Sequence, residues 1–151
     1  MIYGTRLQQL RERSGITQAK AGSLIQLDSG TYCHYEKEEI LIPVKHLSTL
    51  SNFYHVSIDY LFELTDEINY NKMNKDINLI RSGTRLKEFR KEQKLTQVKL
   101  ATLLNTVQPV IANYEKGKHL IATPFLYTIC KKYNISADYL LGKIDHPKYL
   151  K

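Results

Sequence analysis

Side chains that could read a base edge are concentrated in the short stretch "QPVIANYE". The amides of Gln108 and Asn113 can each form two hydrogen bonds with adenine, and the ring of Pro109 can contact the methyl group of thymine. On a helix, Ile111 and Tyr114 would turn inward because they lie three positions apart, and the other three side chains would face outward. This outer face is suited to the major groove of a site that contains A·T pairs. The alternative interpretation is an ordinary solvated surface.

Catalytic and metal-binding patterns are absent from the sequence. Cys33 and His34 are adjacent, but adjacency alone does not make a catalytic dyad. Neither Cys33 nor Cys130 has the CxxC or Cys/His spacing of a metal site, and there is no Gly-rich phosphate loop. We therefore predict no catalytic residue, no metal and no cofactor, and an enzyme is the least favoured class of function. Both cysteines are interpreted as buried free thiols.

The helix that would carry the outer face belongs to a unit that the chain contains twice. The segment "GTRLQQLRERSGITQ" from Gly4 matches "GTRLKEFRKEQKLTQ" from Gly83 without a gap. The offset of about 79 residues holds through Phe62, and roughly a third of the aligned pairs are identical, which is typical of a duplicated structural unit. The sequence therefore predicts two domains and a connector. We place them at residues 1–66, 81–151 and 67–80, respectively.

Each unit has the apolar spacing of five short helices, so the predicted fold is all-α with two tandem five-helix domains. Thr17 and Thr96 stand where the second helix of each unit needs an N-cap. Thr123 and Pro124 are interpreted as the cap and first turn of a later helix. No alternating apolar pattern persists, so strands are not expected.

The connector "TDEINYNKMNKDINLI" is polar, rich in Asn and free of Pro and Gly. This composition leaves two structures open: a short helix that docks through Ile68, Met73 and Ile77, or a mobile tether. No apolar stretch of the chain reaches the ~18 residues that a membrane span needs, and the N-terminus lacks the apolar core of a signal peptide. We expect a cytoplasmic protein without a membrane segment.

The segment "TQVKLATLLNTVQPVIANYEKGK" at residues 96–118 resembles the phage-repressor, or Xre-like, helix-turn-helix domain. The segment "TQAKAGSLIQLDSGTYCHYEKEE" at residues 17–39 is its more divergent copy. The resemblance covers nearly all of residues 4–62 and 83–142. It implies two lambda-repressor-like domains in which the third helix of a unit reads DNA.

The resemblance also implies roles for residues around that helix. Gln97 opens the second helix, where its amide and the free backbone N–H groups can bind a phosphate. The predicted phosphate contacts are Gln97 and, on account of their positive charge rather than the resemblance, Lys99, Lys116 and Lys118. The family has a hydroxyl cap where this sequence has Val107, so either Thr106 caps one residue early or the cap is missing.

Two charged pairs match family positions that form an ion pair between the first and third helices. They are Arg90 with Glu115 and, in the first copy, Arg11 with Glu36. We interpret both pairs as structural, because a guanidinium forked onto a carboxylate is not free to hold a phosphate.

The first copy departs from the family pattern where DNA would be contacted. Its third helix would present Ser29 and His34, which are weaker base readers than Gln and Asn. It ends in "EKEE" where the second copy has "EKGK", so the carboxylates of Glu38 and Glu39 are expected to face phosphates. Gln18, Ser29 and His34 are therefore predicted to be weak DNA contacts.

The two halves of the chain differ strongly in net charge, and this difference is clearer than any difference at a single position. The stretch from Arg81 to the C-terminus has 14 Lys and Arg against five Asp and Glu, a net +9. The stretch up to Asp66 has six against eight, a net −2, and the connector is neutral. Because phosphate neutralisation supplies much of the affinity of DNA-binding modules, the second domain has the better electrostatic footprint.

These patterns favour a sequence-specific regulator that binds double-stranded DNA through the third helix of the second domain. The first domain would either read an adjacent half-site weakly or mediate self-association. The apolar stretch "NFYHVSIDYLFEL" at the end of the first domain motivates a homodimer, and a pseudo-dimer formed by the two copies of one chain stays open. The alternative function is a protein-binding inhibitor or antitoxin-like adaptor that uses the acidic face of the first domain.

Overall fold

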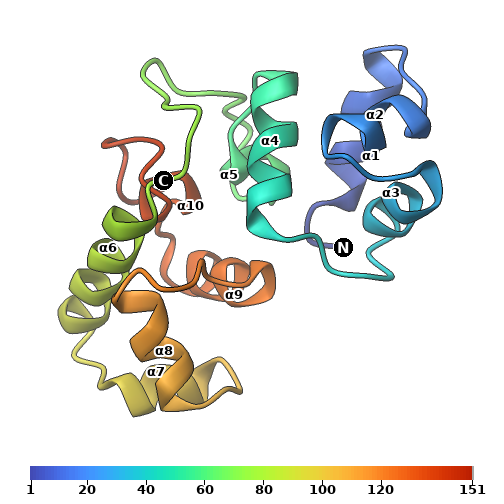
Figure 1. Ribbon diagram of the computed structural model, residues 1–151. Coiled ribbons are helices and arrows are strands. Elements are labelled where there is room, and N and C mark those ends of the chain that lie inside the picture. Colours follow the sequence, from blue (N-terminus) through green and yellow to red (C-terminus); the bar gives the residue numbers. More distant parts are fainter. Residues whose placement is uncertain (151) are drawn as a thin grey trace.

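The computed structural model describes residues 1–150, which form ten helices and no strand element (Figure 1). The first domain contains α1 (Gly4–Arg13), α2 (Gln18–Leu24), α3 (Ser29–Glu36), α4 (Val44–Tyr54) and α5 (Ile58–Leu61). The second contains α6 (Leu79–Glu92), α7 (Gln97–Leu103), α8 (Gln108–Glu115), α9 (Thr123–Tyr133) and α10 (Ala137–Leu140). The predicted all-α fold with two tandem five-helix domains is confirmed.

The second helix of each domain begins at the predicted threonine cap. The Thr17 hydroxyl accepts the backbone N–H of Lys20 at 3.1 Å, and the Thr96 hydroxyl accepts that of Lys99 at 3.0 Å. These hydrogen bonds satisfy donors that the first turn of a helix leaves without an intrahelical partner. The turn between the first two helices is therefore fixed in the same way in both domains.

The predicted cap of α9 is wrong. Ala122 is the N-cap, in an extended conformation, and Thr123 is the first helical residue. The Thr123 hydroxyl donates instead to the carbonyl oxygen of Ile42 in the first domain. The Thr123 hydroxyl, which the local sequence predicted as a helix cap, therefore forms a contact between the domains instead.

The first helix of each domain packs closely on the end of the third helix because a glycine stands at the crossing. A Cβ at Gly83 would lie 2.6 Å from the carbonyl oxygens of Tyr114 and Glu115, and Gly4 meets Glu36 in the same way. Behind this crossing, buried side chains such as Leu7 and Leu86 form the core of each domain, and each stabilises the fold by about 1.5–3 kcal/mol. The crossing holds the third helix at a fixed angle to its domain.

Residues 65–78 are irregular, and the last two residues of the predicted connector, Leu79 and Ile80, already belong to α6. The predicted short helix that docks through Ile68, Met73 and Ile77 is therefore wrong. It hydrogen-bonds to both domains. The Asn52 amide donates to the Lys75 carbonyl oxygen at 2.7 Å, and the Asn74 backbone N–H donates to the Lys143 carbonyl oxygen at 2.7 Å. Of its apolar side chains, Ile68 is exposed, whereas Met73 and Ile77 are half-buried.

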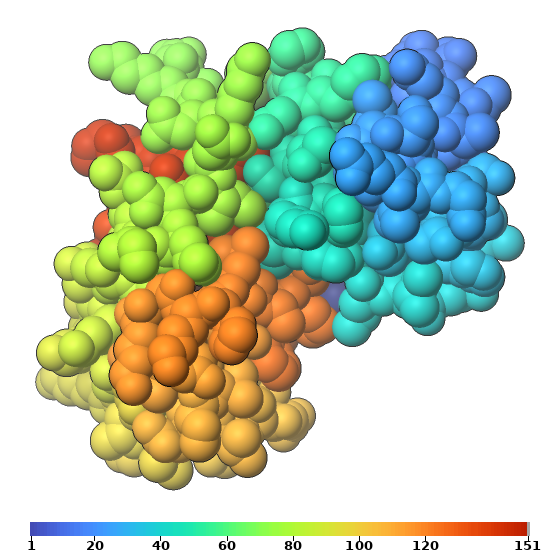
Figure 2. Space-filling model, viewed as in Figure 1, coloured from blue at the N-terminus to red at the C-terminus, as the bar shows by residue number. Residues whose placement is uncertain are grey.

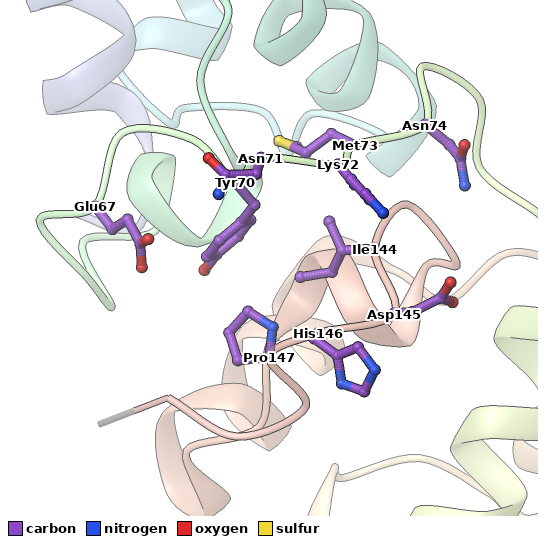
Figure 3. A pocket seen from close by; sticks show the side chains of 10 residues that line it. All are labelled: Glu67, Tyr70, Asn71, Lys72, Met73, Asn74, Ile144, Asp145, His146 and Pro147. Atoms are coloured by element: carbon purple, nitrogen blue, oxygen red, sulfur yellow. The ribbon is translucent and has the colours of Figure 1, made fainter.

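A surface pocket of about 850 Å³ lies where the connector meets the segment after α10 (Figure 3). Connector side chains, including Glu67, Tyr70 and Met73, line one side, and Ile144 with the residues that follow it lines the other. The Tyr70 hydroxyl donates to the carboxylate of Asp59 at 2.8 Å. The pocket therefore adjoins, through Tyr70, the interface between the domains.

That interface is formed by α5 and α10, which exchange reciprocal hydrogen bonds. The Asp138 carboxylate accepts the backbone N–H groups of Ile58 and Asp59 at 3.1 and 2.9 Å. The Asp59 carboxylate accepts the N–H of Ala137 at 2.6 Å. Ile58 and Ala137 occupy equivalent positions in the two copies, as do the two aspartates. Each aspartate therefore caps the first turn of the other domain's short helix.

Both aspartates are fully buried, which is unusual for carboxyl groups. Burial, with a smaller contribution from the charge of Asp138, raises the pKa of Asp59 well above its usual range. Hydroxyl groups of Tyr70 and Ser136 donate to the Asp59 carboxylate. The interface is thus held by polar groups whose hydrogen bonds are made across the two domains.

Lys143 adds a second buried polar contact between the domains. Its ammonium group donates to the hydroxyls of Ser48 and Ser51 and to the Asn52 amide oxygen, each at 3.0 Å, near the end of α4. The Lys143 side chain is fully buried, and burial lowers its pKa. Because a buried ammonium needs all its hydrogen bonds, this contact restrains the position of the second domain on the first.

No helix among residues 1–150 has the length and apolar character needed to cross a membrane.

Candidate nucleic-acid interface

The face of α8 opposite the core carries the three predicted base-reading residues. Ile111 is fully buried and Tyr114 is 9% exposed, so both hold the helix against its domain. Gln108 and Pro109 are exposed, and Asn113 is half-buried. The structure therefore brings Gln108, Pro109 and Asn113 together on one helix, with the two N-terminal residues open to solvent.

The start of α8 has no side-chain cap. Val107 is the N-cap residue, its side chain makes no capping hydrogen bond, and it is 61% exposed. Thr106 does not take over the role, so the missing cap is the correct alternative of the two. Pro109 in the first turn offsets part of this loss, since a proline there gives up no hydrogen bond.

Gln108 is not a free side chain, because it begins a chain of hydrogen bonds that runs into the domain. Its amide donates to the Gln97 amide oxygen at 2.7 Å, and the Gln97 amide donates to Glu115 at 3.1 Å. The Glu115 carboxylate in turn accepts two bonds from the Arg90 guanidinium, at 2.6 and 3.0 Å. The start of α7, the start of α8 and the ion pair between α6 and α8 are therefore connected.

The Arg90–Glu115 pair is structural in its geometry. The side chains of Arg90 and Glu115 are 10% and 3% exposed, and Arg90 also donates to the Leu95 carbonyl oxygen at 2.9 Å. The bond to Glu115 raises the pKa of Arg90 above its ordinary value. All of these bonds point into the protein, so the guanidinium is not available to a phosphate.

The corresponding pair in the first domain has the same form. Arg11 Nε donates to Glu36 at 2.6 Å, and the Gln18 amide donates to the same carboxylate at 3.2 Å. The hydrogen-bond chain ends there. Ser29 occupies the position of Gln108 and makes no side-chain bond to Gln18 among the contacts of residues 1–150.

The predicted lysine contacts lie on α7 and at the C-terminal end of α8. Lys99 lies in the first turn of α7, Lys116 is the C-cap residue of α8, and Lys118 follows two residues later. All three are exposed, and none forms an ion pair with a carboxylate in the described part of the chain. Gln97, by contrast, already uses its amide within the domain, so its contact with a phosphate would come from the backbone.

The equivalent face of α3 is polar but differently built. Asp28 caps the helix by accepting the backbone N–H of Thr31 at 2.7 Å. Ser29 is exposed, and His34 lies 3.1 Å from the carboxylate of Glu39, with both side chains 53% exposed. An acidic side chain therefore stands where the second domain has Lys118.

The prediction that the Glu38 carboxylate faces phosphates is wrong. The carboxylate accepts the backbone N–H groups of Ile2, Tyr3 and Gly4 at 2.9, 3.1 and 2.9 Å. It caps the start of α1, where the positive end of the helix dipole favours an anion. Gly117 takes this place in the second domain, where α6 begins at Leu79 and its extra turn covers the glycine.

Both cysteines are free thiols. Cys130 is a fully buried free thiol whose pKa is raised by burial, as interpreted from the sequence. Cys33 is also free but only half-buried, so the interpretation holds in part for this residue.

Two family models match the chain, one in each domain. A model described as "Helix-turn-helix" matches residues 7–61, and a model described as "Helix-turn-helix domain" matches residues 83–146. The chain therefore belongs to the phage-repressor, or Xre-like, helix-turn-helix family and contains two tandem copies of its domain.

Two curated relatives come from Bacillus subtilis (strain 168). The uncharacterized HTH-type transcriptional regulator YobD is 35% identical over 66 residues, which are 44% of this chain and 59% of the relative. The HTH-type transcriptional regulator ImmR is 32% identical over 81 residues, which are 52% of this chain and 64% of the relative. The matches thus span less than two thirds of the length of either relative.

Sequence reasoning missed the contact between Gln97 and Gln108. The two residues lie on different helices, and no pattern within either helix indicates that their amides meet. It also missed the roles of Asp59 and Asp138, although a signal was present: both copies contain Ser-x-Asp-Tyr-Leu in their last helix.

Proposed function

We propose that the chain is a sequence-specific, DNA-binding transcriptional regulator whose second domain inserts α8 into the major groove. The observation that carries the proposal is the Gln108–Gln97 hydrogen bond of 2.7 Å. It fixes one base-reading amide at the exposed start of α8 before DNA is bound. A helix in the major groove contacts base edges mainly through its N-terminal residues, which is where this amide lies.

The distribution of positive charge also supports the insertion of α8 into the major groove. Lys99, Lys116 and Lys118 are exposed around α8, and the second half of the chain carries a net +9. Phosphate contacts from these side chains would set the position of the helix, while Gln108 and Asn113 would select the bases. The names of the two relatives, both HTH-type transcriptional regulators, agree with this role.

A second function, binding to another protein, is favoured by one feature of the first domain. His34 and Glu39 form an exposed pair on the surface where DNA would lie, and Ile40 and Leu41 beside them are 44% and 54% exposed. A mixed acidic and apolar surface of this kind suits a protein partner better than a phosphate backbone.

Selection of bound duplexes from a randomised library tests the proposed function. We expect a preferred site that contains A·T pairs under α8, with binding that weakens steeply as salt is raised. The selected duplex and a scrambled duplex of the same composition are then compared by titration. Equal affinity for the two duplexes would contradict sequence-specific reading, and no binding at low salt would favour the protein-binding function.

A further inference from the structure

The contact between α5 and α10 relates the two domains by an approximate two-fold rotation. Asp59 bonds the N–H of Ala137, and Asp138 bonds the N–H of Ile58, so equivalent groups exchange equivalent contacts. In a two-fold interface between identical subunits, residue i of one subunit contacts residue j of the other, and residue j of the first contacts residue i of the second. Here the two sides of that interface belong to one chain.

The arrangement is fixed by more than the reciprocal bonds. Thr123 donates to the Ile42 carbonyl oxygen, and the rings of Phe62 and Tyr127 pack edge to face with centroids 5.5 Å apart. Lys143 adds three hydrogen bonds to the end of α4. These contacts involve α4, α5 and their equivalents α9 and α10, which form the middle of the molecule (Figure 1).

The two recognition helices lie outside this middle part. Figure 2 shows the blue lobe of the first domain, which includes α3, and the orange lobe that includes α8 at opposite ends of the molecule. The apolar segment that motivated a homodimer instead lies between the lobes: Phe62 and the helix before it contact the second domain of the same chain. Part of the surface expected to join two chains is therefore already occupied within one chain, whereas Phe53 of the same segment is 40% exposed.

The two outer faces present different side chains in equivalent places. Gln108, Asn113 and Lys118 on the second domain correspond to Ser29, His34 and Glu39 on the first. A two-fold axis matches the backbone symmetry of duplex DNA, whereas unequal side chains require unequal base sequences at the two ends.

We propose that one chain, acting as a pseudo-dimer, recognises a non-palindromic duplex that contains two unequal half-sites. In this complex α8 occupies the major groove of the stronger half-site, and α3 occupies that of a weaker half-site about one helical turn away. The inference rests on the proposed function and extends it to the first domain, to the stoichiometry and to the asymmetry of the DNA.

The first experiment uses the full chain and the duplex that it selects from a randomised library. Native mass spectrometry of the complex should show one chain per duplex, and the selected sequence should lack two-fold symmetry. Inserting about 5 bp between the half-sites should reduce affinity at least ten-fold, because it rotates one half-site by half a turn. Inserting about 10 bp should cost as much, because the fixed interface cannot follow the longer spacing.

A second experiment adds a cation where the first domain has Glu39. Glu39→Lys places a lysine at the position equivalent to Lys118 and removes a carboxylate that makes one exposed contact, with His34. If α3 lies in the groove, affinity should rise roughly three- to ten-fold and the salt slope should steepen by about 0.9. Glu67→Lys makes the same charge change on the connector, beside the pocket of Figure 3, and should alter affinity less than two-fold.

Several results would overturn the pseudo-dimer. The first is a complex of two chains on a palindromic duplex. The second is a selected site with only one half-site, whose affinity does not change when base pairs are inserted. The third is an equal change in affinity for Glu39→Lys and Glu67→Lys. Each of these results leaves sequence-specific binding through α8 intact, so the proposed function survives them. The absence of any preferred sequence would instead overturn the proposed function and this inference together.

Discussion

The amide of Gln108 donates to the amide oxygen of Gln97 at 2.7 Å, across the turn that joins α7 to α8. Gln97 is held in turn by Glu115, whose carboxylate is bonded to Arg90. A side chain that is ordered before binding loses less conformational freedom when it meets a base, which favours affinity. In the proposed function, the buried ion pair would therefore support the recognition surface through this chain of hydrogen bonds and not through a contact of its own with DNA.

Replacing Gln108 or Asn113 by alanine should weaken binding to the selected duplex by ~1–3 kcal/mol and relax its base preference. The reason is the loss of paired hydrogen bonds to a base edge. Titration of the selected and scrambled duplexes at fixed salt measures both effects. Ser29→Ala and His34→Ala serve as matched controls and should cost less, and a larger loss from these two would assign the dominant reading to the first domain.

Gln97→Ala should reduce discrimination between the two duplexes although Gln97 itself need not contact a base. The substitution leaves the Arg90–Glu115 bonds in place, so the unfolding free energy should change little. It removes the acceptor that orients the Gln108 amide. Discrimination that stays at the wild-type level would show that the orienting bond has no role in recognition.

Lys99→Ala and Lys116→Ala should weaken binding to the selected and the scrambled duplex alike. Each removes an exposed cation near α8, so the slope of log affinity against log salt should decrease in magnitude by about one. Titration at several salt concentrations gives the slope. Lys72→Ala on the connector removes the same charge and should leave the slope unchanged. A slope that does not differ between Lys99→Ala and wild type would remove Lys99 from the interface.

Glu38→Ala should lower the unfolding free energy by about 0.5–2 kcal/mol, as expected for the loss of a helix cap. The Glu38 carboxylate accepts the backbone N–H groups of Ile2, Tyr3 and Gly4. Urea unfolding measures the loss. Glu39→Ala, one residue later, removes only an exposed contact with His34 and should be close to neutral. Equal destabilisation by the two substitutions would contradict the capping role.

Asp59→Asn and Asp138→Asn should have different consequences, because the two carboxylates have different hydrogen-bond partners. At position 59, an asparagine oxygen can still accept the N–H of Ala137 while its NH₂ group donates to hydroxyl oxygens of Tyr70 and Ser136. At position 138, both carboxylate oxygens accept backbone N–H groups, so an NH₂ group leaves one of them unsatisfied. Asp138→Asn should therefore cost about 1–3 kcal/mol.

The effect of Asp59→Asn should depend on pH. Since burial raises the pKa of Asp59, the folded chain holds this proton at pH values where the unfolded chain has lost it. Stability from the group is thus fully present below about pH 4 and is lost as the pH rises through the raised pKa. Asp59→Asn cannot ionise, so its unfolding free energy relative to wild type should increase with pH. Urea unfolding at several pH values measures the difference, and a constant difference would contradict the raised pKa.

Local chemistry made several elements predictable from the sequence. Thr17 and Thr96 cap the helices that follow them because an N-cap needs only a hydroxyl and the next few backbone donors. The inward turn of Ile111 and Tyr114 follows from the period of a helix. The fold of each domain could be predicted from the sequence because these signals occur in both copies.

Contacts between distant segments were not predictable in the same way. Glu38 reaches the start of α1, more than 30 residues earlier, and Thr123 bonds a carbonyl group in the other domain. From local sequence, Glu38 would be a solvated acid and Thr123 a helix cap. Each side chain instead hydrogen-bonds to a group that is distant in the sequence. The polar composition of the connector similarly gave no sign that Asn52 and Lys143 would bond to it.

Because both domains belong to one chain, the occupancy of the DNA site should depend on protein concentration differently than it would for two separate chains. Two separate chains must associate before they fill a two-part site, so at low abundance occupancy rises with roughly the square of protein concentration. When two modules are linked, the second meets its site at an effective concentration set by the linker, in the millimolar range for short linkers. In the proposed pseudo-dimer, whose domains are joined through Asp59 and Asp138, dilution cannot separate the halves. Occupancy would then change in direct proportion to abundance, giving a graded response without a threshold.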